Sequence, residues 1–463
     1  MRVEDGNGAS APPAGARSAD PRTRQLLEAP VLPLLLRLAW PNVLIMLAQA
    51  STGLIETWWV AKLGTDALAG MALVYPAFML MTAISGGAVG GGISSAVARA
   101  LGSGRREEAD GLVLHAVVVC LLLGLACSAI FLIFGPAIYR FLGGTEGELA
   151  AALTYSDVLF AGIVLIWLMN GLASVIRGTG NMLVPAAVTC GGVLFLIPVS
   201  PVLIFGAGPV PALGIAGGAV ALITYFGAGT LALAAYILSG RNPARFRWVR
   251  IRRAPFADIL RVGGLSALNA LQTNLVIAGA TALVATAAGA QALAGYGTGV
   301  RLEYLLIPLI FGIGAPMVAM VGTNIGAGRA DRARHIALAG GLLAFAVTEA
   351  IGLAAALFPH AWLSLFSAEP GMIAAGSAYL RIVGPAYGFF GLGLALYFAA
   401  QGAGRLFWPI VAGGLRIAVA LGGGWLALRL TGSIEALFAA LAAALAVYGL
   451  VIFAAVRSGA WLR

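Results

Sequence analysis

Long apolar segments occur along the whole chain and limit what it can fold into. Twelve segments of about 20 or more residues lie between charged, Gly or Pro residues: 38–60, 67–95, 111–134, 150–174, 183–206, 212–238, 258–286, 292–322, 336–358, 374–400, 407–428 and 433–457. Each is long enough to cross a hydrocarbon core of about 30 Å as an α-helix, whereas barrel strands need only about ten alternating residues. The chain is therefore predicted to be an all-α polytopic membrane protein with twelve transmembrane helices.

The second half of the chain repeats the first. Gly102-Ser103-Gly104-Arg105 returns as Gly326-Ala327-Gly328-Arg329, and Gly178-Thr179-Gly180 returns as Gly402-Ala403-Gly404. Because each half contains an even number of crossings, both halves enter the membrane in the same orientation, as two parallel six-helix repeats. Duplicated membrane chains are typical of secondary transporters, whose halves move around a site that lies between them.

The repeat divides the chain into four parts. We expect a disordered cytoplasmic tail over residues 1–30, an N-terminal six-helix lobe over 31–238, a basic cytoplasmic linker over 239–257 and a C-terminal six-helix lobe over 258–463. The tail is rich in Ala, Pro, Gly and Arg and has no apolar core of signal-peptide length. The linker contains the densest cluster of basic residues, which we interpret as a topology anchor.

The basic residues indicate the orientation in the membrane. The net charge is +10, although only 10% of the residues are charged and 60% are hydrophobic. Most of the 28 Lys and Arg residues fall in segments on one side of the predicted helices. This distribution follows the positive-inside rule and predicts a bacterial-type inner (plasma) membrane protein with both termini in the cytoplasm. We therefore attribute the charge to topology and expect no nucleic-acid partner.

Residue patterns that would support catalysis are missing from the sequence. Lys62 is the only lysine and is followed by Leu63, which excludes a Walker-type ATP loop. His115, His335 and His360 are far apart and match no zinc or hydrolytic pattern. An intramembrane transferase would need clustered acid, His or Cys residues at one membrane face, and a channel would need a filter-like repeat or a charged ring. We expect no enzyme activity, no cofactor, no metal and no disulfide, so an ion gradient must drive any uphill transport.

Glu56 is the candidate for ion coupling. An ionisable residue within a transmembrane segment is costly unless it faces a wet cavity or a partner. Gln49, Thr52 and Glu56 are spaced three and four apart, so they share one helix face, and Asn42 precedes them on the same segment. This polar stripe favours a lined cavity. The alternative is an interfacial Glu56 that pairs with Lys62 at the water boundary.

Other polar residues in the predicted helices are candidates for a substrate cavity. The full set of candidates is Asn42, Gln49, Thr52, Tyr75, Asn170, Ser200, Asn269, Gln272, Asn274, Arg301, Glu303, Tyr304 and Arg416. Arg416 lies near mid-depth, judged from the rise of about 1.5 Å per residue. Glu303 or Glu349 could neutralise Arg301 or Arg416, so structural and substrate-binding roles both stay open for these charges.

Several motifs resemble the multidrug and toxic compound extrusion (MATE) family of secondary transporters. They are Pro41 followed by Gly53-Leu54-Ile55-Glu56-Thr57, Leu101-Gly102-Ser103-Gly104, Arg177-Gly178-Thr179-Gly180-Asn181, Pro201-Val202-Leu203-Ile204-Phe205-Gly206, and Val321-Gly322 with Gly326-Ala327-Gly328. The resemblance extends from about residue 30 to 457. It implies an antiporter that exports amphipathic, often cationic compounds in exchange for H⁺ or Na⁺ by alternating access. It also implies a role in ion coupling for Glu56, which stands at the position of the family's first-helix acid.

Four positions depart from the family pattern. An acid often found in the segment 183–206 is Ser200 here, and the Asn one turn earlier is Leu196. A Glu of some branches aligns with Asn274, and an Asp aligns with Phe390. Without these ligands, an oxygen cage for Na⁺ is hard to assemble around Glu56. We therefore expect H⁺ to be the coupling ion, with Na⁺ as the alternative.

The expected mechanism is exchange controlled by protonation. In the outward-facing state Glu56 takes a proton from outside, which weakens substrate binding or bends the first helix, and inward reorientation releases the proton. Glu56 aligns with Ala280 of the second repeat, so ion coupling is expected in the N-terminal half. The alternative function is a lipid-linked oligosaccharide flippase of the same superfamily, which would need a strongly cationic cavity. The expected partners are a small-molecule amphipathic substrate and membrane lipid, and we expect a monomer.

Overall fold

The computed structural model describes residues 20–462, which form helices joined by short loops, so residues 1–19 of the predicted tail lie outside the described part. Eleven helical segments are long and apolar enough to cross a membrane. The pair α6 and α7, bent by 46°, makes a twelfth. The predicted all-α architecture with up to twelve spans is confirmed, because each predicted apolar segment falls on one of these helices.

The helices follow the order of the two repeats. The first repeat comprises α2 (Val31–Ala61), α3 (Thr65–Ala83) continued by η2 (Ile84–Val89) and α4 (Gly90–Gly102), α5 (Arg106–Phe141), α6 (Glu146–Ala161), α7 (Ile163–Gly178), α8 (Leu183–Phe205) and α9 (Ile215–Leu238). The second comprises α10 (Arg253–Ala287), α11 (Ala290–Gly326), α12 (Ala330–Leu357), α13 (Pro359–Leu363), α14 (Pro370–Val383) continued by η3 (Gly384–Ala386) and α15 (Tyr387–Ala403), α16 (Phe407–Ile417) continued by η4 (Ala418–Gly423) and α17 (Gly424–Thr431), α18 (Ile434–Arg457) and η5 (Ala460–Leu462). The short helix α1 (Pro21–Glu28) precedes both repeats.

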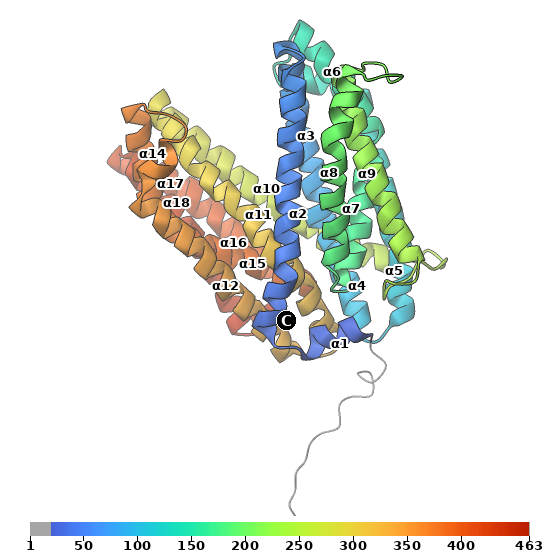
Figure 1. The fold of residues 1–463 in the computed structure, drawn as a ribbon. Helices are drawn as coiled ribbons and strands as arrows, with labels where there is room; N and C mark the ends of the chain where they lie inside the picture. Colours follow the sequence, from blue (N-terminus) through green and yellow to red (C-terminus); the bar gives the residue numbers. More distant parts are fainter. Residues whose placement is uncertain (1–19, 463) are drawn as a thin grey trace, which may run out of the picture.

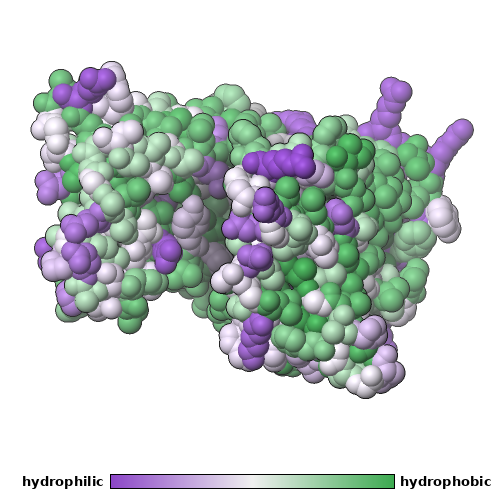
Figure 2. Space-filling view, turned by 90° about the horizontal axis from the view of Figure 1, so that it is seen from above, coloured by the Kyte–Doolittle hydropathy of each residue, from purple (hydrophilic) through white to green (hydrophobic). Residues whose placement is uncertain are grey.

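The two repeats form two lobes arranged as a V (Figure 1). The N-lobe contains α2 to α9 and the C-lobe contains α10 to α18. The lobes meet at the end of the molecule where α1 lies, here called the closed end, and separate toward α6 and α14 at the open end (Figure 1). Seen from the open end, the molecule is hollowed between the lobes, and apolar residues cover much of its outer surface (Figure 2). Such a surface suits contact with lipid.

Glycines of the repeated motif allow the lobes to touch at the closed end. A Cβ atom on Gly102 would collide with the carbonyl of Thr323, and a Cβ atom on Gly326 would collide with the carbonyl of Arg99. The two contacts are equivalent under the repeat, so the duplicated motif lies at the lobe junction. The Arg99 guanidinium also pairs with Asp258 across this junction at 2.6 Å. Small residues are what close helix approach in membranes requires.

Gly326→Ala should therefore destabilise the closed junction. The added methyl group meets backbone rather than a flexible side chain, so the helices must move apart, which costs about 2 kcal/mol for overpacking of this kind. Thermal unfolding of the purified protein should show a lower Tm for this variant. Gly414→Ala is the matched control, because a Cβ atom on Gly414 has open space around it. Equal Tm values for the two variants would mean that the close backbone approach is absent.

The predicted disorder of residues 1–30 is wrong for Pro21–Glu28, which forms α1. Asp20 caps the helix by accepting a backbone hydrogen bond, and a proline suits the first turn because its missing N–H needs no partner. Leu26 is buried, and its carbonyl accepts a hydrogen bond from Asn324 Nδ2 at 3.1 Å. The helix is therefore held by its contact with α11, a tertiary contact that composition alone does not reveal.

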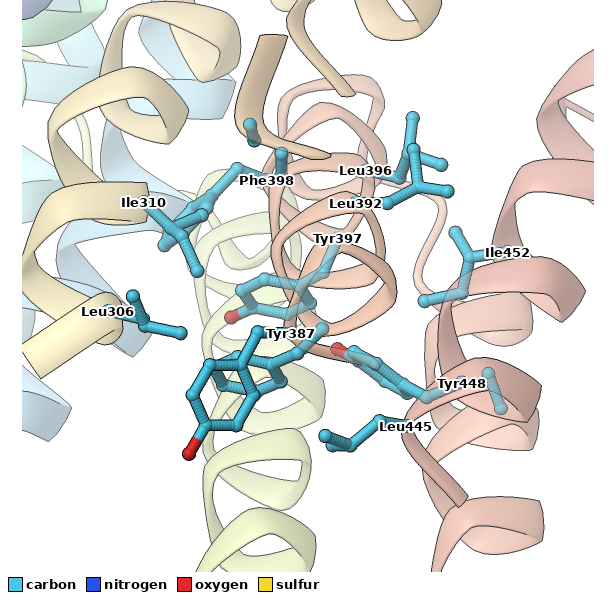
Figure 3. Close-up of a cluster of buried hydrophobic side chains, with 14 of the residues drawn as sticks. Leu306, Ile310, Tyr387, Leu392, Leu396, Tyr397, Phe398, Leu445, Tyr448 and Ile452 are labelled. Carbon is cyan, nitrogen blue, oxygen red and sulfur yellow. The ribbon is translucent and has the colours of Figure 1, made fainter. Parts of the chain in front are cut away.

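Each lobe has its own apolar core. The C-lobe core includes side chains of α11, α15 and α18, among which Tyr387, Tyr397 and Tyr448 are buried (Figure 3). The buried residues Val31, Leu34 and Leu35 at the start of α2 also belong to this C-lobe cluster. The packing boundary between the lobes therefore runs through the first turns of α2 rather than before residue 31.

The basic linker lies against the N-lobe. Residues 241–252 contain no helix, and α10 begins at Arg253. The backbone N–H of Arg245 donates to Asp110 at 2.7 Å, and that of Arg252 donates to His115 Nε2 at 3.1 Å. The linker is therefore attached to the beginning of α5 by specific hydrogen bonds as well as by its place between the repeats.

Candidate functional site

Glu56 lies in the last two turns of α2, toward the open end of the N-lobe, and is buried with only 1% of its surface exposed. Within the described residues neither of its carboxylate oxygens has a hydrogen-bond partner. The Ser200 hydroxyl of α8 approaches the carboxylate without meeting hydrogen-bond geometry, and it is also buried and unpartnered. On the opposite side Gly218 of α9 makes room, because a Cβ atom there would lie 2.9 Å from Glu56 Oε2. The site thus leaves a carboxyl group without a counter-charge.

A cavity of about 490 Å³ contains this carboxyl group. The residues that line it come from four N-lobe segments and are mostly aromatic or apolar: Gln49, Thr52, Gly53, Glu56, Met71, Tyr75, Phe78, Met79, Thr82, Tyr155, Leu222, Tyr225 and Phe226. The predicted polar stripe of Gln49, Thr52 and Glu56 therefore faces one cavity, and Tyr75 joins it. Thr52 satisfies its own hydroxyl by donating to the Ala48 carbonyl at 3.0 Å.

Lys62 is not the partner of Glu56. Its ammonium group lies 3.6 Å from the ring centroid of Trp58 and 4.7 Å from that of Trp59, which is a cation–π arrangement. Within residues 20–462 the ion pairs involve other residues. The alternative of an interfacial Glu56–Lys62 pair is therefore wrong for this conformation.

The C-lobe has a cavity of its own, of about 330 Å³, with a buried ion pair at its edge. Arg416 Nη2 donates to Glu303 Oε1 at 3.1 Å, and the Tyr379 hydroxyl donates to Glu303 Oε2 at 3.2 Å. The guanidinium also lies over the rings of Phe390 and Tyr448, at 5.1 and 5.5 Å from their centroids. Of the alternatives left open by the sequence, the structure thus selects Glu303 as the partner of Arg416.

The two lobe cavities occupy equivalent positions in the two repeats. Equivalent lining pairs are Thr52 and Val276, Gly53 and Ile277, Glu56 and Ala280, Phe78 and Glu303, and Tyr155 and Tyr379. Each cavity therefore has one acid, but the acids come from different helices. The N-lobe acid has no cation beside it, whereas the C-lobe acid is neutralised.

The remaining candidates do not line either lobe cavity. Arg301, Tyr304 and Asn274 are exposed, and Arg301 lies over the Phe366 ring at 5.5 Å. They line neither lobe cavity, and their place in a substrate cavity between the lobes stays a prediction. Glu349 accepts a hydrogen bond from the Gly388 N–H at 2.8 Å and pairs with no arginine among the described residues.

Three amides among the candidates donate to groups close by. Asn42 donates to the Leu38 carbonyl at 3.0 Å, Asn170 donates to Ser85 Oγ at 2.8 Å, and Gln272 donates to the Ile410 carbonyl at 3.2 Å. Asn269 is buried and lies outside the lining of the lobe cavities. These contacts stabilise helix packing, and a substrate role for these residues stays a prediction.

Sequence reasoning missed a third cavity, of about 260 Å³, that lies between the lobes. Arg177 and Ser94 line it from the N-lobe, and Gln401 lines it from the C-lobe. Arg177 stands at the end of an apolar segment and therefore resembles an ordinary topology arginine. One sequence signal was available. Gln401 occupies the equivalent position in the second repeat and is uncharged, whereas a pure topology signal would be expected to place a basic residue at both helix ends.

Within residues 20–462 no group of three or more His, Cys, Asp or Glu side chains is arranged to hold a metal ion. Cys120, Cys127 and Cys190 are free thiols. Two similar helical lobes around a hollow, with buried charges in the membrane-spanning helices, define a membrane transporter rather than an enzyme.

Comparisons with known proteins agree with this class. The MatE family model matches residues 41–202 and 266–426, so the chain belongs to the MatE family. An FAD transporter of Shewanella oneidensis is 29% identical over 379 residues, covering 81% of this chain and 82% of that protein. A protein of Deinococcus radiodurans described as "Probable multidrug resistance protein NorM" is 30% identical over 378 residues, covering 75% and 77%. A crystal structure of MATE in the bent conformation superposes with a TM-score of 0.87 at 23% identity, over 95% of this chain and 98% of that one.

Proposed function

We propose that this transporter exports amphipathic small molecules, cationic drugs or metabolites among them, in exchange for protons. The observation that carries the proposal is the buried Glu56 carboxyl, which has no hydrogen-bond partner and no cation within a cavity of aromatic and apolar walls. An ionised carboxylate in such a place is strongly disfavoured unless it is neutralised. Glu56 therefore carries a proton in this open conformation. Relatives described as multidrug resistance proteins support the export of drug-like molecules.

The cavity favours H⁺ over Na⁺ as the coupling ion. A sodium ion needs several oxygen ligands, as other hard cations do. Here Glu56 is the only acid that lines the cavity, and Ser200 and Leu196 stand where the family often has an acid and an Asn. A proton needs one carboxyl group alone. The N-lobe site therefore suits proton binding without further ligands.

The exchange cycle combines this site with the two-lobed fold. In the orientation that we propose, the closed end faces the cytoplasm of a bacterial inner membrane and the open end faces outside. A proton that enters from outside binds Glu56 and displaces the exported molecule. Closure at the open end and opening of the glycine-lined junction then expose Glu56 to the cytoplasm, where the proton leaves and a new substrate binds.

The flippase alternative requires a cluster of free buried cations for a pyrophosphate group. Arg301 is exposed and Arg416 is neutralised by Glu303, so Arg177 is left as a single buried arginine rather than a member of a cluster. This distribution supports small-molecule export over transport of a lipid-linked oligosaccharide.

Export under separately imposed gradients tests the coupling ion. Purified protein in liposomes that contain a fluorescent cationic dye should drive dye movement when a pH gradient is imposed without Na⁺. A Na⁺ gradient at equal pH on both sides should cause no more dye movement than is seen with protein-free liposomes. Dye movement that follows the Na⁺ gradient and ignores the pH gradient would overturn the proposal.

A further inference from the structure

The cavity between the lobes lies on the axis that relates the two repeats. It is lined by repeat-equivalent pairs: Gly87 and Phe311, Gly91 and Ala315, Ser94 and Val318, and Arg177 and Gln401. It adjoins the closed junction, because Ser95 beside Ser94 donates to the Gln401 carbonyl at 2.6 Å. A site that both lobes build can sense their relative movement, and transporters of repeated architecture place substrate on such an axis.

Arg177 is the charged group of this cavity. It is 8% exposed, and its one hydrogen bond joins Nη2 to Ser174 Oγ at 2.8 Å. Within residues 20–462 no carboxylate lies within ion-pair distance of it. A guanidinium has five N–H donors, so most of its hydrogen-bonding capacity is unused. A buried cation without a counter-charge is costly, which favours a negatively charged occupant.

A purely structural role explains this arginine poorly. Arg177 lies in the last turn of α7, where the helix dipole favours a positive charge. This interaction offsets only a small part of the cost of removing a charge from water, and an exposed side chain would obtain it equally well. The Ser174 hydroxyl donates to the Asn170 carbonyl at 2.7 Å and accepts a hydrogen bond from the Arg177 guanidinium. It thereby holds the guanidinium in place without neutralising it.

The other polar groups of the cavity are compatible with an anion. No acidic side chain lines it, and the Ser94 hydroxyl is the second group with a donor. The Gln401 amide is already occupied, since Nε2 donates to the Gly87 carbonyl at 3.1 Å and to Ser266 Oγ at 2.8 Å. Its Oε1 atom is an unpartnered acceptor on the same wall, so an occupant that also carries a donor fits best.

We infer that the cavity on the repeat axis binds a carboxylate or phosphate group of the transported molecule through Arg177. The planar guanidinium matches the two oxygens of such a group with two parallel hydrogen bonds. The inference rests on the proposed export function and adds a substrate class to it: molecules that combine an anionic oxygen group with an amphipathic body. Glu56 and Arg177 then divide the chemistry, with the proton in the N-lobe and the substrate anion between the lobes.

Equilibrium binding to two matched dyes tests this site. Rhodamine B carries a carboxylate, and its methyl ester replaces this group by a neutral ester on the same aromatic body. With the protein in phosphatidylcholine nanodiscs and no ion gradient, the wild-type protein should bind the free acid more tightly than the ester. Arg177→Gln should weaken binding of the free acid roughly tenfold or more, as expected for loss of a charged hydrogen bond, and leave ester binding unchanged. Arg177→Lys keeps the positive charge but loses the two parallel N–H donors of the guanidinium. Its affinity for the free acid should lie between those of the wild-type protein and Arg177→Gln.

The controls separate this site from its alternatives. Arg381→Gln removes an exposed arginine of α14 and should alter neither affinity. Nanodiscs that contain the anionic lipid phosphatidylglycerol test whether a lipid phosphate can occupy the same site. If it does, this lipid abolishes the preference of the wild-type protein for the free acid over the ester. Equal weakening of both dyes in Arg177→Gln indicates a structural role and overturns the inference, as does a wild-type protein with no preference for the acid in either lipid. This binding assay uses no ion gradient, so a failure of the coupling proposal would be seen separately, in the liposome assay.

Discussion

Replacing Glu56 by Gln should abolish dye export driven by a pH gradient and reduce it to the level of protein-free liposomes. Gln has nearly the same size as Glu and fits the cavity beside Gly218, but it cannot bind and release a proton in the relevant pH range. The lobes of the variant can still move, but proton movement down its gradient is no longer coupled to export of the dye. Efflux of a fluorescent dye from proteoliposomes with an acidic exterior measures the effect.

Glu146→Gln is the matched control for this experiment. Glu146 is an exposed acid at the start of α6, at the open end, and its loss should leave export at the wild-type rate. A Glu56→Gln protein that exports dye as fast as Glu146→Gln under the same pH gradient would show that the proton is carried elsewhere.

Glu303→Ala should lower the free energy of unfolding by about 3 to 5 kcal/mol, the usual cost of breaking a buried ion pair by removal of one partner. The variant leaves the Arg416 guanidinium buried without its counter-charge and the Tyr379 hydroxyl without its acceptor. Unfolding titrations in mixed micelles give the difference. A protein with Arg416→Met and Glu303→Leu together should recover most of the loss, because no charge is then left unpaired.

The double variant decides how the pair acts. If it is as unstable as Glu303→Ala alone, the loss comes from poor packing around the cavity rather than from the unpaired charge. If the double variant folds well but no longer transports, the pair has a role in transport beyond stability.

The arrangement of the helices was largely predictable because membrane segments must be long, apolar and helical. The apolar runs predicted the twelve spans, and the Gly102 and Gly326 motifs marked the repeat. The helix α1 was missed because its stability comes from contact with Asn324 of α11, which is close in space and distant in sequence. The bend between α6 and α7 was missed for a similar reason, since it occurs within a continuous apolar segment.

The candidate site was predictable where residues share one helix. Gln49, Thr52 and Glu56 were expected on one face because of their spacing, and they line one cavity. The choice of partner for Arg416 was not predictable, because Glu303 and Glu349 are both far from it in sequence. Arg177 was overlooked because an arginine at a helix end is usually a topology signal. Only the three-dimensional packing shows that it is buried between the lobes.

The two lobes share a scaffold and differ in charge. Their cavities are equivalent under the repeat, but the Glu56 cavity has a free acid and the Glu303 cavity has a neutralised one. This asymmetry supports an N-lobe that exchanges a proton and a C-lobe that keeps a fixed structure. The Arg177 cavity lies between them, where movement of one lobe against the other changes its lining.

Proton release on substrate binding tests the central claim most directly, because it needs neither a membrane nor a gradient. Purified protein in weakly buffered detergent solution is mixed with a cationic dye, and a pH indicator follows the release of protons. If Glu56 holds the proton that the substrate displaces, the wild-type protein releases protons as the dye binds. Glu56→Gln, whose neutral amide resembles the protonated acid, binds the dye more weakly and releases no proton at saturating dye. Proton release of equal size from both proteins would contradict the assignment of the coupling proton to Glu56.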